Sequence, residues 1–598
     1  MDHSQVSRQF PAPRWTWLPA PGSWRYHLLL AAVGALLLGP LAGVTAAYMN
    51  FSLGFFVGGQ VLAGLLGSTV TAGYGAEGRH GANYIQTAAA SVASMSGMGV
   101  LVQAMVWLGL PQPPAWQLMA YLLCIGMFGV GVGMLYTPVL VDRLRLAFPS
   151  GLAVANILRA LTDPALLRRS LGTLGSGMAA GLAGGLLVSR VAWLGAIELS
   201  MSTVGAGMVV GARVGIPVVL GGLLAWSLQP FFVSIGWLAP GDPFRKITFL
   251  IALGMIMGVA VVDMGLIGWR AAQSLRARAA APLQADWQRV HGRRLLLWIA
   301  AWGAGTVLTG HLLLGQPLAF LLLALALVFV FALVNGISVG VSDLNPISSA
   351  FVVAVLLMVA LGLRDPAVGL MAGTVLLVST SVACDMQQDR STGWRLGTNR
   401  VVQFRYQVLG IVVGAVLAVV FARLFMAAYP VLLQDQTLMK AGEQPAEWGA
   451  AMTYKFVGVL RGLTEDKPFQ RHAIAAGVAI GALIEILRRI VRASAPYRRL
   501  AGQGRRGAAM EFAVDAVLLP SPYALSFGGF VNLPTSLWFG AGGVASSLWE
   551  WRAGRRTTRD DSLPPDMSAS SLAGGGLIAG DALAALGLGL AGLLALAR

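Results

Sequence analysis

Long apolar runs, separated by short polar or arginine-rich stretches, recur along almost the whole chain. A transmembrane α-helix needs about 20 consecutive apolar residues. The pattern therefore predicts an all-α integral membrane protein. Because several of the runs are short or interrupted by Gly and Pro, the expected number is about 14–16 transmembrane helices, some of them broken or re-entrant. The runs begin near Leu28, Phe51, Tyr84, Gln117, Leu171, Ser202, Ile216, Ile247, Leu295, Leu318, Ser349, Val368, Val408, Ala473, Ala513, Leu533 and Leu572.

The charges between the runs predict the orientation of the chain. Short cytoplasmic loops of membrane proteins carry an excess of Lys and Arg. We therefore expect the arginine-rich segments to be cytoplasmic, together with the N-terminal tail; they are 141–169, 270–294, 390–405, 488–506 and 552–559. The segment 434–470 carries mixed charge instead, and it is predicted to be an extramembrane loop on the opposite side with a short helix.

A basic linker near the middle of the chain divides it into two halves of comparable length. The predicted organisation is a polar N-terminal tail (1–24), a first transmembrane half (25–268), the basic cytoplasmic linker (269–294) and a second transmembrane half (295–598).

The two halves contain similar interruptions. Residues 202–207 echo residues 526–529, each stretch being Gly-rich and followed by a Pro and more Gly, and residues 83–87 echo residues 345–349. Paired interruptions in two halves indicate the binding site of a secondary carrier. The competing explanation is that Gly-rich apolar sequence resembles itself by composition alone.

The composition excludes an ordinary soluble protein. Of the residues, 56% are hydrophobic and 11% are charged, whereas soluble domains average about 25% charged residues. The 76 glycines suit helices that approach one another closely. The formal net charge of +17 is spread between apolar runs rather than over one soluble domain, which argues against nucleic-acid binding.

Metal and nucleotide motifs are absent from the sequence. Cys124 and Cys384 lie in or beside apolar runs, and the six histidines are scattered, without His-x-x-x-His or Cys-x-x-Cys spacing. The sequence also lacks a Walker A motif. We therefore expect no cofactor, no resident metal and no enzymatic activity.

Two carboxylates four residues apart, Asp385 and Asp389, follow an apolar run that ends at Cys384. Residues at i and i+4 share one face of a helix, so both point the same way if the helix continues through them. A short basic turn from Arg390 to Arg400 is expected to follow. Carboxylates at the end of a spanning helix are costly unless they meet water, a cation or a partner. A position in the headgroup layer is the alternative.

The sequence from Cys384 to Gly397 reads Cys-Asp-Met-x-x-Asp-x-x-Thr-Gly-x-x-Leu-Gly. It resembles the signature of the oligopeptide transporter family, which includes the yellow-stripe-like metal-chelate transporters. Ser391 stands where the family pattern has Lys, and Ala82 stands where it has Glu. Elements similar to the family's Asn-x-x-Gln-Thr, Phe-Pro-Ser-Gly-x-Ala and Gly-Glu-x-Leu blocks begin at Asn83, Phe148 and Gly580, in the family's order.

Polar residues within or beside the apolar runs are the candidate functional residues. Substrate binding is predicted at Asn83, Gln86, Thr87, Asp343, Asn345, Gln403, Ser526, Gly528 and Asn532, and proton coupling at Asp385, Asp389 and Asp581. The structural alternatives are an amide clamp between helices for the first three residues, a helix cap near Asn345 and tight packing around Gly528.

The resemblance implies proton-coupled symport of a small peptide or a peptide-like substrate, by a multi-pass protein of the inner membrane. Transport of siderophore-like metal chelates is the alternative, and a channel is a rival from another class. An intramembrane enzyme acting on lipid would need a nucleophile–base or metal set, which the sequence does not suggest. The expected partners are the substrate, protons, membrane lipid and, through small-residue faces, a second copy in a homodimer.

Overall fold

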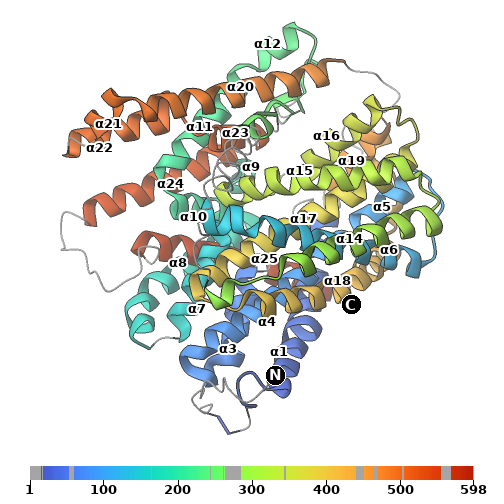
Figure 1. Cartoon of the computed structure of the whole chain (residues 1–598), viewed down its shortest axis with the longest axis horizontal. Coiled ribbons are helices and arrows are strands. Elements are labelled where there is room, and N and C mark those ends of the chain that lie inside the picture. Colours follow the sequence, from blue (N-terminus) through green and yellow to red (C-terminus); the bar gives the residue numbers. More distant parts are fainter. Residues whose placement is uncertain are drawn as a thin grey trace.

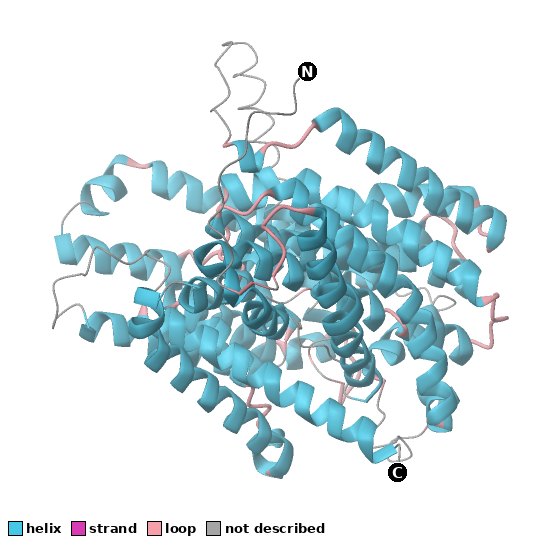
Figure 2. Cartoon of the chain, turned by 90° about the horizontal axis from the view of Figure 1, so that it is seen from below, coloured by secondary structure: helices cyan, strands magenta, loops and turns pink. Residues whose placement is uncertain are grey.

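The computed structural model describes residues 15–16, 18–52, 60–162, 164–242, 244, 246–248, 250–252, 254–259, 262, 285–342, 345, 347–439, 450–461, 468–501, 504–531, 533–553 and 568–596. Within these residues the chain is helical and contains no β-strand, as Figure 2 shows.

The first half supplies α1 (Trp24–Ala31), α2 (Gly39–Ser52), α3 (Gln60–Thr71), α4 (Gly78–Gly97), α5 (Val100–Trp107), α6 (Ala115–Thr137), α7 (Pro149–Thr162), α8 (Pro164–Arg190), α9 (Ala192–Ala196), α10 (Met201–Val210), α11 (Ala212–Ser227) and α12 (Gln229–Ser234). The second half supplies α14 (Gly292–Leu308), α15 (Leu318–Ser342), α16 (Ile347–Ala360), α17 (Pro366–Leu396), α18 (Arg400–Ala428), α19 (Ala451–Arg461), α20 (Pro468–Ala493), α21 (Ala495–Ala501), α22 (Gly504–Ala513), α23 (Pro522–Phe530), α24 (Leu533–Ala553) and α25 (Ala569–Leu596).

The expectation of an all-α membrane protein is confirmed. Nine helices of the described part are long and apolar enough to cross a membrane, and the helices Met201–Val210 and Lys246–Val259 are apolar but shorter. The predicted count of about 14–16 came from apolar runs. Some of those runs fold as helices shorter than a full span, such as α10 and α16, so apolar runs and spanning helices do not correspond one to one.

The breaks fall where the sequence places Pro or Gly. A π-helical segment ends at Arg143, and the next helix, α7, begins at Pro149 after Phe148, whose φ of 44° is non-helical. The residue before a Pro disfavours the α conformation, and α15 and α16 are separated at Asn345 accordingly. The break between α23 and α24 lies between Phe530 and Leu533.

The largest core lies around α6 and α17, which pack closely through small residues. A Cβ on Gly129 would lie 2.6 Å from the carbonyl oxygen of Ser379, and a Cβ on Gly133 would lie 2.8 Å from that of Ala383. Across the same core, α4 packs on α18, where Gly414 meets Val92. The α6 glycines thus bring α6 close to α17, and Gly414 brings α18 close to α4.

The four helices α10, α11, α23 and α24 form a second packed unit, on the left of Figure 1 below α20. A Cβ on Gly207 of α10 would overlap the carbonyl oxygen of Phe539, and a Cβ on Gly528 of α23 would overlap that of Val218. Gly528 follows Gly207 by 321 residues (528 − 207). Phe539, which supplies the oxygen facing Gly207, follows Val218, which supplies the oxygen facing Gly528, by the same number (539 − 218).

The same separation relates a second set of contacts in this unit. A Cβ on Gly221 would overlap the carbonyl oxygen of Leu525, and a Cβ on Gly542 would overlap that of Val204. The two broken segments therefore contact each other reciprocally, as around a local two-fold axis. The sequence motifs pair residue 202 with residue 526, a separation of 324 residues (526 − 202), which differs by three from the 321 of the contacts. The difference arises because Gly-rich runs can be aligned in several registers.

The segment 434–470 contains the expected short helix, α19, but this helix is packed rather than exposed. Phe456, Val457 and Leu460 are fully buried, and Thr453 donates from Oγ1 to Oε1 of Gln103 over 2.6 Å. The position of this segment relative to a membrane stays a prediction. Of the basic linker, residues 269–284 lie outside the described residues.

Candidate functional site

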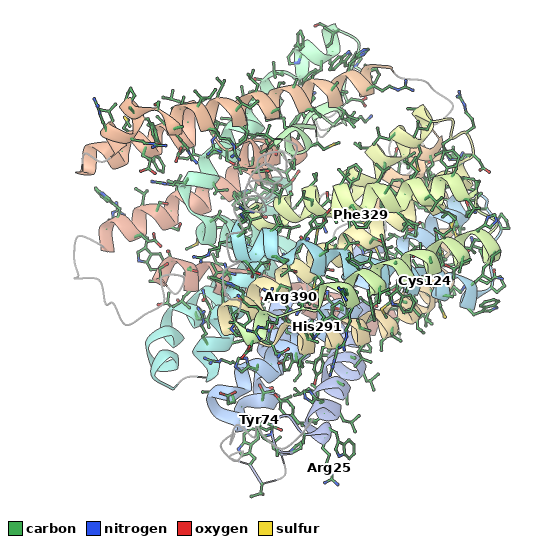
Figure 3. The ribbon with its side chains drawn as sticks, in the orientation of Figure 1. Arg25, Tyr74, Cys124, His291, Phe329 and Arg390 are labelled. Carbon is green, nitrogen blue, oxygen red and sulfur yellow. The ribbon has the colours of Figure 1, made fainter. Side chains whose placement is uncertain are left out.

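The two predicted carboxylates lie on one continuous helix, because α17 runs through both and ends only at Leu396. The expected basic turn from Arg390 is therefore wrong over its first half. The helix stops at Gly397, whose φ of 70° is the left-handed conformation that glycine adopts readily at a helix C-terminus. Arg390 is thus a helical residue, and it is 1% exposed, near the middle of the molecule in Figure 3.

Asp389 is fully buried and contacts α4. Its Oδ1 accepts a hydrogen bond of 2.7 Å from Nε2 of Gln86. Asn83 and Thr87 lie on the same buried face of α4, as the spacing in the sequence predicted. The predicted face of α4 and the predicted carboxylate of α17 therefore meet.

Gln403 of α18 joins the three helices. Its Nε2 donates to Oγ1 of Thr87 over 2.9 Å and to the backbone oxygen of Asp389 over 2.8 Å. Its Oε1 accepts from Nη1 of Arg390 over 2.6 Å. A Cβ on Gly393 would lie 2.6 Å from that same Oε1 and 3.5 Å from Nδ2 of Asn83, so only glycine leaves room for this contact.

Many buried polar atoms of this cluster have no hydrogen-bond partner among the described residues. They are Nδ2 and Oδ1 of Asn83, Oε1 of Gln86, Oδ2 of Asp385, Oδ2 of Asp389, Nη2 of Arg390 and both amide atoms of Gln407. Buried polar atoms are normally satisfied by protein or by ordered water. A concentration of unsatisfied donors and acceptors in one place indicates a site that takes up water or a polar ligand.

Asp385 lies one helical turn before Asp389 on the same side of α17. The hydroxyls of Ser94 and Ser381 approach each other to 3.4 Å at this level, between α4 and α17. The polar face therefore extends from Gln403 along α17 to Asp385, as expected for two carboxylates four residues apart.

The arginine-rich end of α17 and the start of α18 contact α7 and the segment before it. Arg400 forms a two-pronged ion pair with Asp142, with distances of 2.7 and 3.0 Å to the two carboxylate oxygens. Thr392 donates from Oγ1 to the backbone oxygen of Gly151 over 2.9 Å, and Arg395 donates to the oxygen of Ala147 over 2.9 Å. These contacts cover the cluster on the side predicted to be cytoplasmic.

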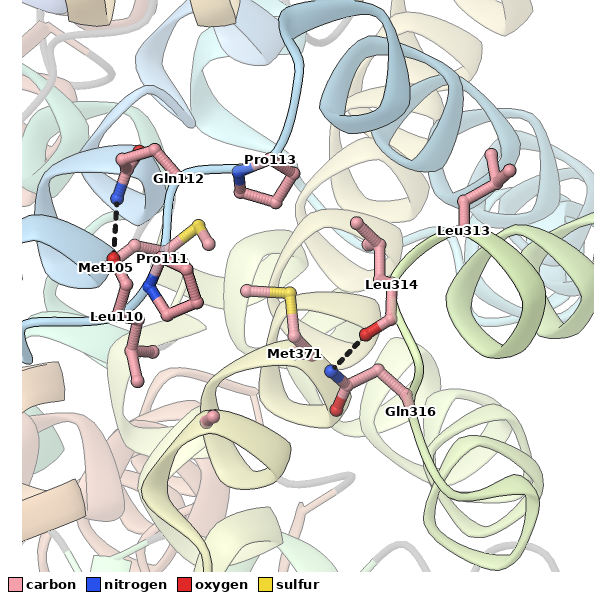
Figure 4. A pocket seen from close by; sticks show the side chains of 10 residues that line it. Met105, Leu110, Pro111, Gln112, Pro113, Leu313, Leu314, Gln316 and Met371 are labelled. Carbon is pink, nitrogen blue, oxygen red and sulfur yellow. Dashed lines mark hydrogen bonds between the residues drawn. The ribbon is translucent and has the colours of Figure 1, made fainter.

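A cavity of about 220 Å³ lies toward the other end of α17 (Figure 4). It is lined mainly by apolar side chains, with Gln112 and Gln316 at its edge, and Met371 lines it from α17. Met371 precedes Asp389 by 18 residues (389 − 371), which corresponds to about 27 Å along an α-helix. The cavity and the polar cluster are therefore separate features of the same helix.

The profile of the OPT oligopeptide transporter protein family matches residues 28–591 of the chain. The chain belongs to the OPT oligopeptide transporter family. No curated protein is similar enough to be given as a relative. Membership makes the chain a multi-pass membrane transporter of oligopeptides or similar substrates.

Other predicted site residues of this OPT family member lie away from the cluster. Asp581 of α25 accepts from the backbone N and the Oγ of Ser202, over 2.9 and 2.6 Å, at the start of α10. Ser526 is buried and donates to the backbone oxygen of Tyr523. The space beside Gly528 is filled by α11, so the close approach that glycine permits is made there by another helix.

The remaining predicted residues are at the α15–α16 break or outside the described part. Asn345 is half-buried, and its Oδ1 has no partner among the described residues. Asp343 and Asn532 lie outside the described residues. Two further acids near apolar runs, Glu485 and Asp515, form ion pairs with arginines of α20.

Sequence reasoning did not place Arg390 in the buried polar cluster of α4, α17 and α18. A charged residue after two carboxylates suggested a turn at the membrane surface. The usable signal was the Gly at position 397, which marks the helix end, together with the spacing of four residues between Met386 and Arg390. Nε of Arg390 in fact lies 2.9 Å from Sδ of Met386.

Proposed function

We propose that this OPT family member imports small peptides or peptide-like substrates across the inner membrane, driven by proton symport. The observation that carries the proposal is the buried cluster on α4, α17 and α18, in which a carboxylate, a guanidinium and several amides have polar atoms without a partner among the described residues. A peptide offers the complementary groups, which are an amine, a carboxylate and backbone amides.

The substrate in this proposal binds between α4 and α18, with Asn83, Thr87 and Gln403 as its amide and hydroxyl partners. This differs from a site built mainly on broken segments, because the glycines near Gly528 are engaged with α11. The cluster is covered at the arginine-rich end by the Asp142–Arg400 pair. Opening of that end would release the substrate toward the cytoplasm, as alternating access requires.

Asp389 is the proposed proton carrier, with Asp385 as the second carboxylate. One oxygen of Asp389 accepts from Gln86, and the other has no partner among the described residues. A proton on the second oxygen neutralises the group without breaking the first hydrogen bond. Both states of the carboxyl are thus compatible with the observed contact.

The test is uptake into proteoliposomes that contain the purified full chain. A panel of di-, tri- and tetrapeptides and of ferric chelates is offered with and without an inward proton gradient. Saturable, gradient-dependent uptake of peptides is expected, with acidification of the lumen reported by a trapped pH dye. Uptake of chelates but not peptides would establish the metal-chelate alternative. Current without saturation would indicate a channel, and uptake indifferent to the gradient would remove the symport proposal.

A further inference from the structure

Arg390 is a buried cation that forms no ion pair with any described residue. It is 1% exposed, and no carboxylate among the described residues lies within ion-pair distance of it. Nη1 donates to Oε1 of Gln403, Nε faces Sδ of Met386, and Nη2 has no partner among the described residues. Both hydrogen-bond partners are neutral, so the guanidinium is desolvated without a carboxylate bonded to it among the described residues. Buried charges are normally paired, because removing an ion from water is costly.

The adjacent carboxylate of Asp389 attracts the guanidinium electrostatically but forms no ion pair with it. Asp389 precedes Arg390 in the sequence, but its Oδ1 accepts from Gln86 on α4, and its Oδ2 is among the atoms without a partner. Neighbouring residues on a helix point in directions about 100° apart. The two charged groups therefore face different parts of the cluster, and each has an unsatisfied atom.

Asn83 brings a second donor to the same place as the guanidinium. The Cβ position of Gly393 lies 2.6 Å from Oε1 of Gln403 and 3.5 Å from Nδ2 of Asn83, so these two amides flank one glycine of α17. Nη1 of Arg390 donates to that same Oε1. Asn83 is fully buried, and neither atom of its amide has a partner among the described residues. The guanidinium and the Asn83 amide thus both lie around Gly393 and Gln403, and each has an N–H donor without a partner among the described residues.

We propose that Arg390 and Asn83 bind a carboxylate group of the substrate. The planar guanidinium recognises a carboxylate with directed hydrogen bonds as well as with charge. The proposal rests on the transport function proposed above, and it narrows the substrate class. A free carboxylate, such as a peptide C-terminus or a carboxylate chelator, is required, and an otherwise identical neutral amide is discriminated against.

The decisive experiment compares acid and amide forms of one probe. Binding of alanine tripeptide, its C-terminal amide and citrate is measured by thermal-shift titration of the purified full chain in nanodiscs. The wild type is expected to bind the free acid at least about tenfold more tightly than the amide. In Arg390→Gln the acid-to-amide ratio falls to about one, and Arg390→Lys, which keeps the charge without the planar fork, retains an intermediate ratio.

Arg395→Gln is the matched control. Arg395 lies on the same helix, but its guanidinium contacts Ser391 and the backbone oxygen of Ala147. Its removal should leave the acid-to-amide ratio unchanged, even if the protein becomes less stable. The acid-to-amide affinity ratio of the wild type is measured without any variant, so misfolding of a mutant does not affect that part of the result.

Each outcome decides one of the two proposals. Equal affinity for acid and amide in the wild type, an unchanged ratio in Arg390→Gln, or binding of neither tripeptide acid nor citrate would overturn the carboxylate site. Gradient-driven peptide uptake combined with equal affinities leaves the transport proposal intact without this site. Binding of citrate that depends on Arg390, without peptide binding or uptake, supports the carboxylate site and removes the peptide proposal.

Discussion

Gln86 and Asp389 are joined by a hydrogen bond of 2.7 Å between Nε2 and Oδ1, although 303 residues separate them in the sequence. The bond connects α4 of the first half with α17 of the second half. Both side chains are fully buried, and each keeps one oxygen without a partner among the described residues. A change in the charge of Asp389 therefore acts directly on the contact between α4 and α17.

Replacing Asp389 by Asn tests the proton role of this group. Asn keeps the size of the side chain and an oxygen that accepts from Gln86, but it cannot carry a titrating proton. Uptake driven by a proton gradient is expected to fall at least about tenfold, the equivalent of about 1.4 kcal/mol. Exchange of labelled for unlabelled substrate without a gradient should persist, because exchange needs no net proton movement.

Asp365→Asn is the matched control for this substitution. Asp365 is an exposed carboxylate that caps the start of the same helix by accepting from the backbone N of Ala367. Its loss should affect stability slightly and leave coupling intact. If Asp385→Asn and Asp389→Asn both retain full gradient-driven uptake, neither carboxylate carries the proton.

Two glutamines one turn apart on α18 are expected to respond in opposite ways to replacement by Leu. Gln403 bonds to Thr87, Arg390 and the backbone of Asp389. Gln403→Leu leaves buried polar groups unsatisfied and should lower stability by about 1–3 kcal/mol. Both amide atoms of Gln407 have no partner among the described residues, so Gln407→Leu should be neutral or stabilising to the fold.

Thermal unfolding of both variants in the same detergent measures this difference. If Gln407→Leu destabilises the protein as much as Gln403→Leu, the amide of Gln407 is already satisfied by water that the fold requires. The contrast between the two positions depends only on hydrogen bonds, since both side chains are fully buried and the substitutions are identical.

The sequence was sufficient to predict the helical class, the presence of helices broken at Pro and Gly, and the shared face of Asp385 and Asp389. These features follow from local chemistry: apolar runs, proline geometry and helical periodicity. The partner of a buried polar side chain depends on tertiary packing instead. Periodicity placed Gln86 on the inner face of α4, but it gave no information that Asp389 would lie opposite.

Arg390 shows the second limit of sequence reasoning. A charged residue in such a segment is usually solvated, so a basic turn was the expectation. The structure buries it because α17 continues for two more turns to Gly397 and because Gln403 supplies an acceptor from α18. The register of the Gly-rich unit was also beyond local reasoning, since it is set by backbone contacts such as that of Gly207 with Phe539.

The reciprocal contacts of that unit predict matched effects for two distant glycines. Gly207→Ala and Gly528→Ala each place a methyl group on a backbone oxygen of the facing helix. Each should lower stability by about 1–3 kcal/mol through overpacking, and the two effects should be similar. Gly172→Ala and Gly175→Ala are the controls, because a Cβ at either position meets no atom within 4 Å.

Expression level and thermal unfolding of the four alanine variants provide the measurement. Loss of stability at Gly207 without loss at Gly528 would contradict the equivalence of the two contacts. Uniform tolerance would mean that the helices of this unit are not packed backbone to backbone.

The ion pair between Asp142 and Arg400 is expected to hold the arginine-rich end of the transporter closed. The Arg400 side chain is 3% exposed and that of Asp142 is 21% exposed, with 2.7 Å between their closest atoms. Asp142→Asn leaves a largely buried guanidinium without its counter-charge and should destabilise this closed arrangement by about 1–3 kcal/mol. The exposed pair Arg289–Asp286 is the control, and its disruption should change little.

Exchanging the two charged residues distinguishes the contribution of the ion pair from the effect of changing each residue alone. The double variant Asp142→Arg/Arg400→Asp should recover part of the stability and transport that each single variant loses, with a coupling energy of about 0.5–3 kcal/mol in a double-mutant cycle. The rate at which a water-soluble maleimide labels a cysteine introduced at Thr392 reports opening of this end. Labelling should be faster in Asp142→Asn than in the parent and should slow again in the exchanged pair. Equal rates in all three proteins would show that the ion pair stabilises the fold without controlling access to the cluster.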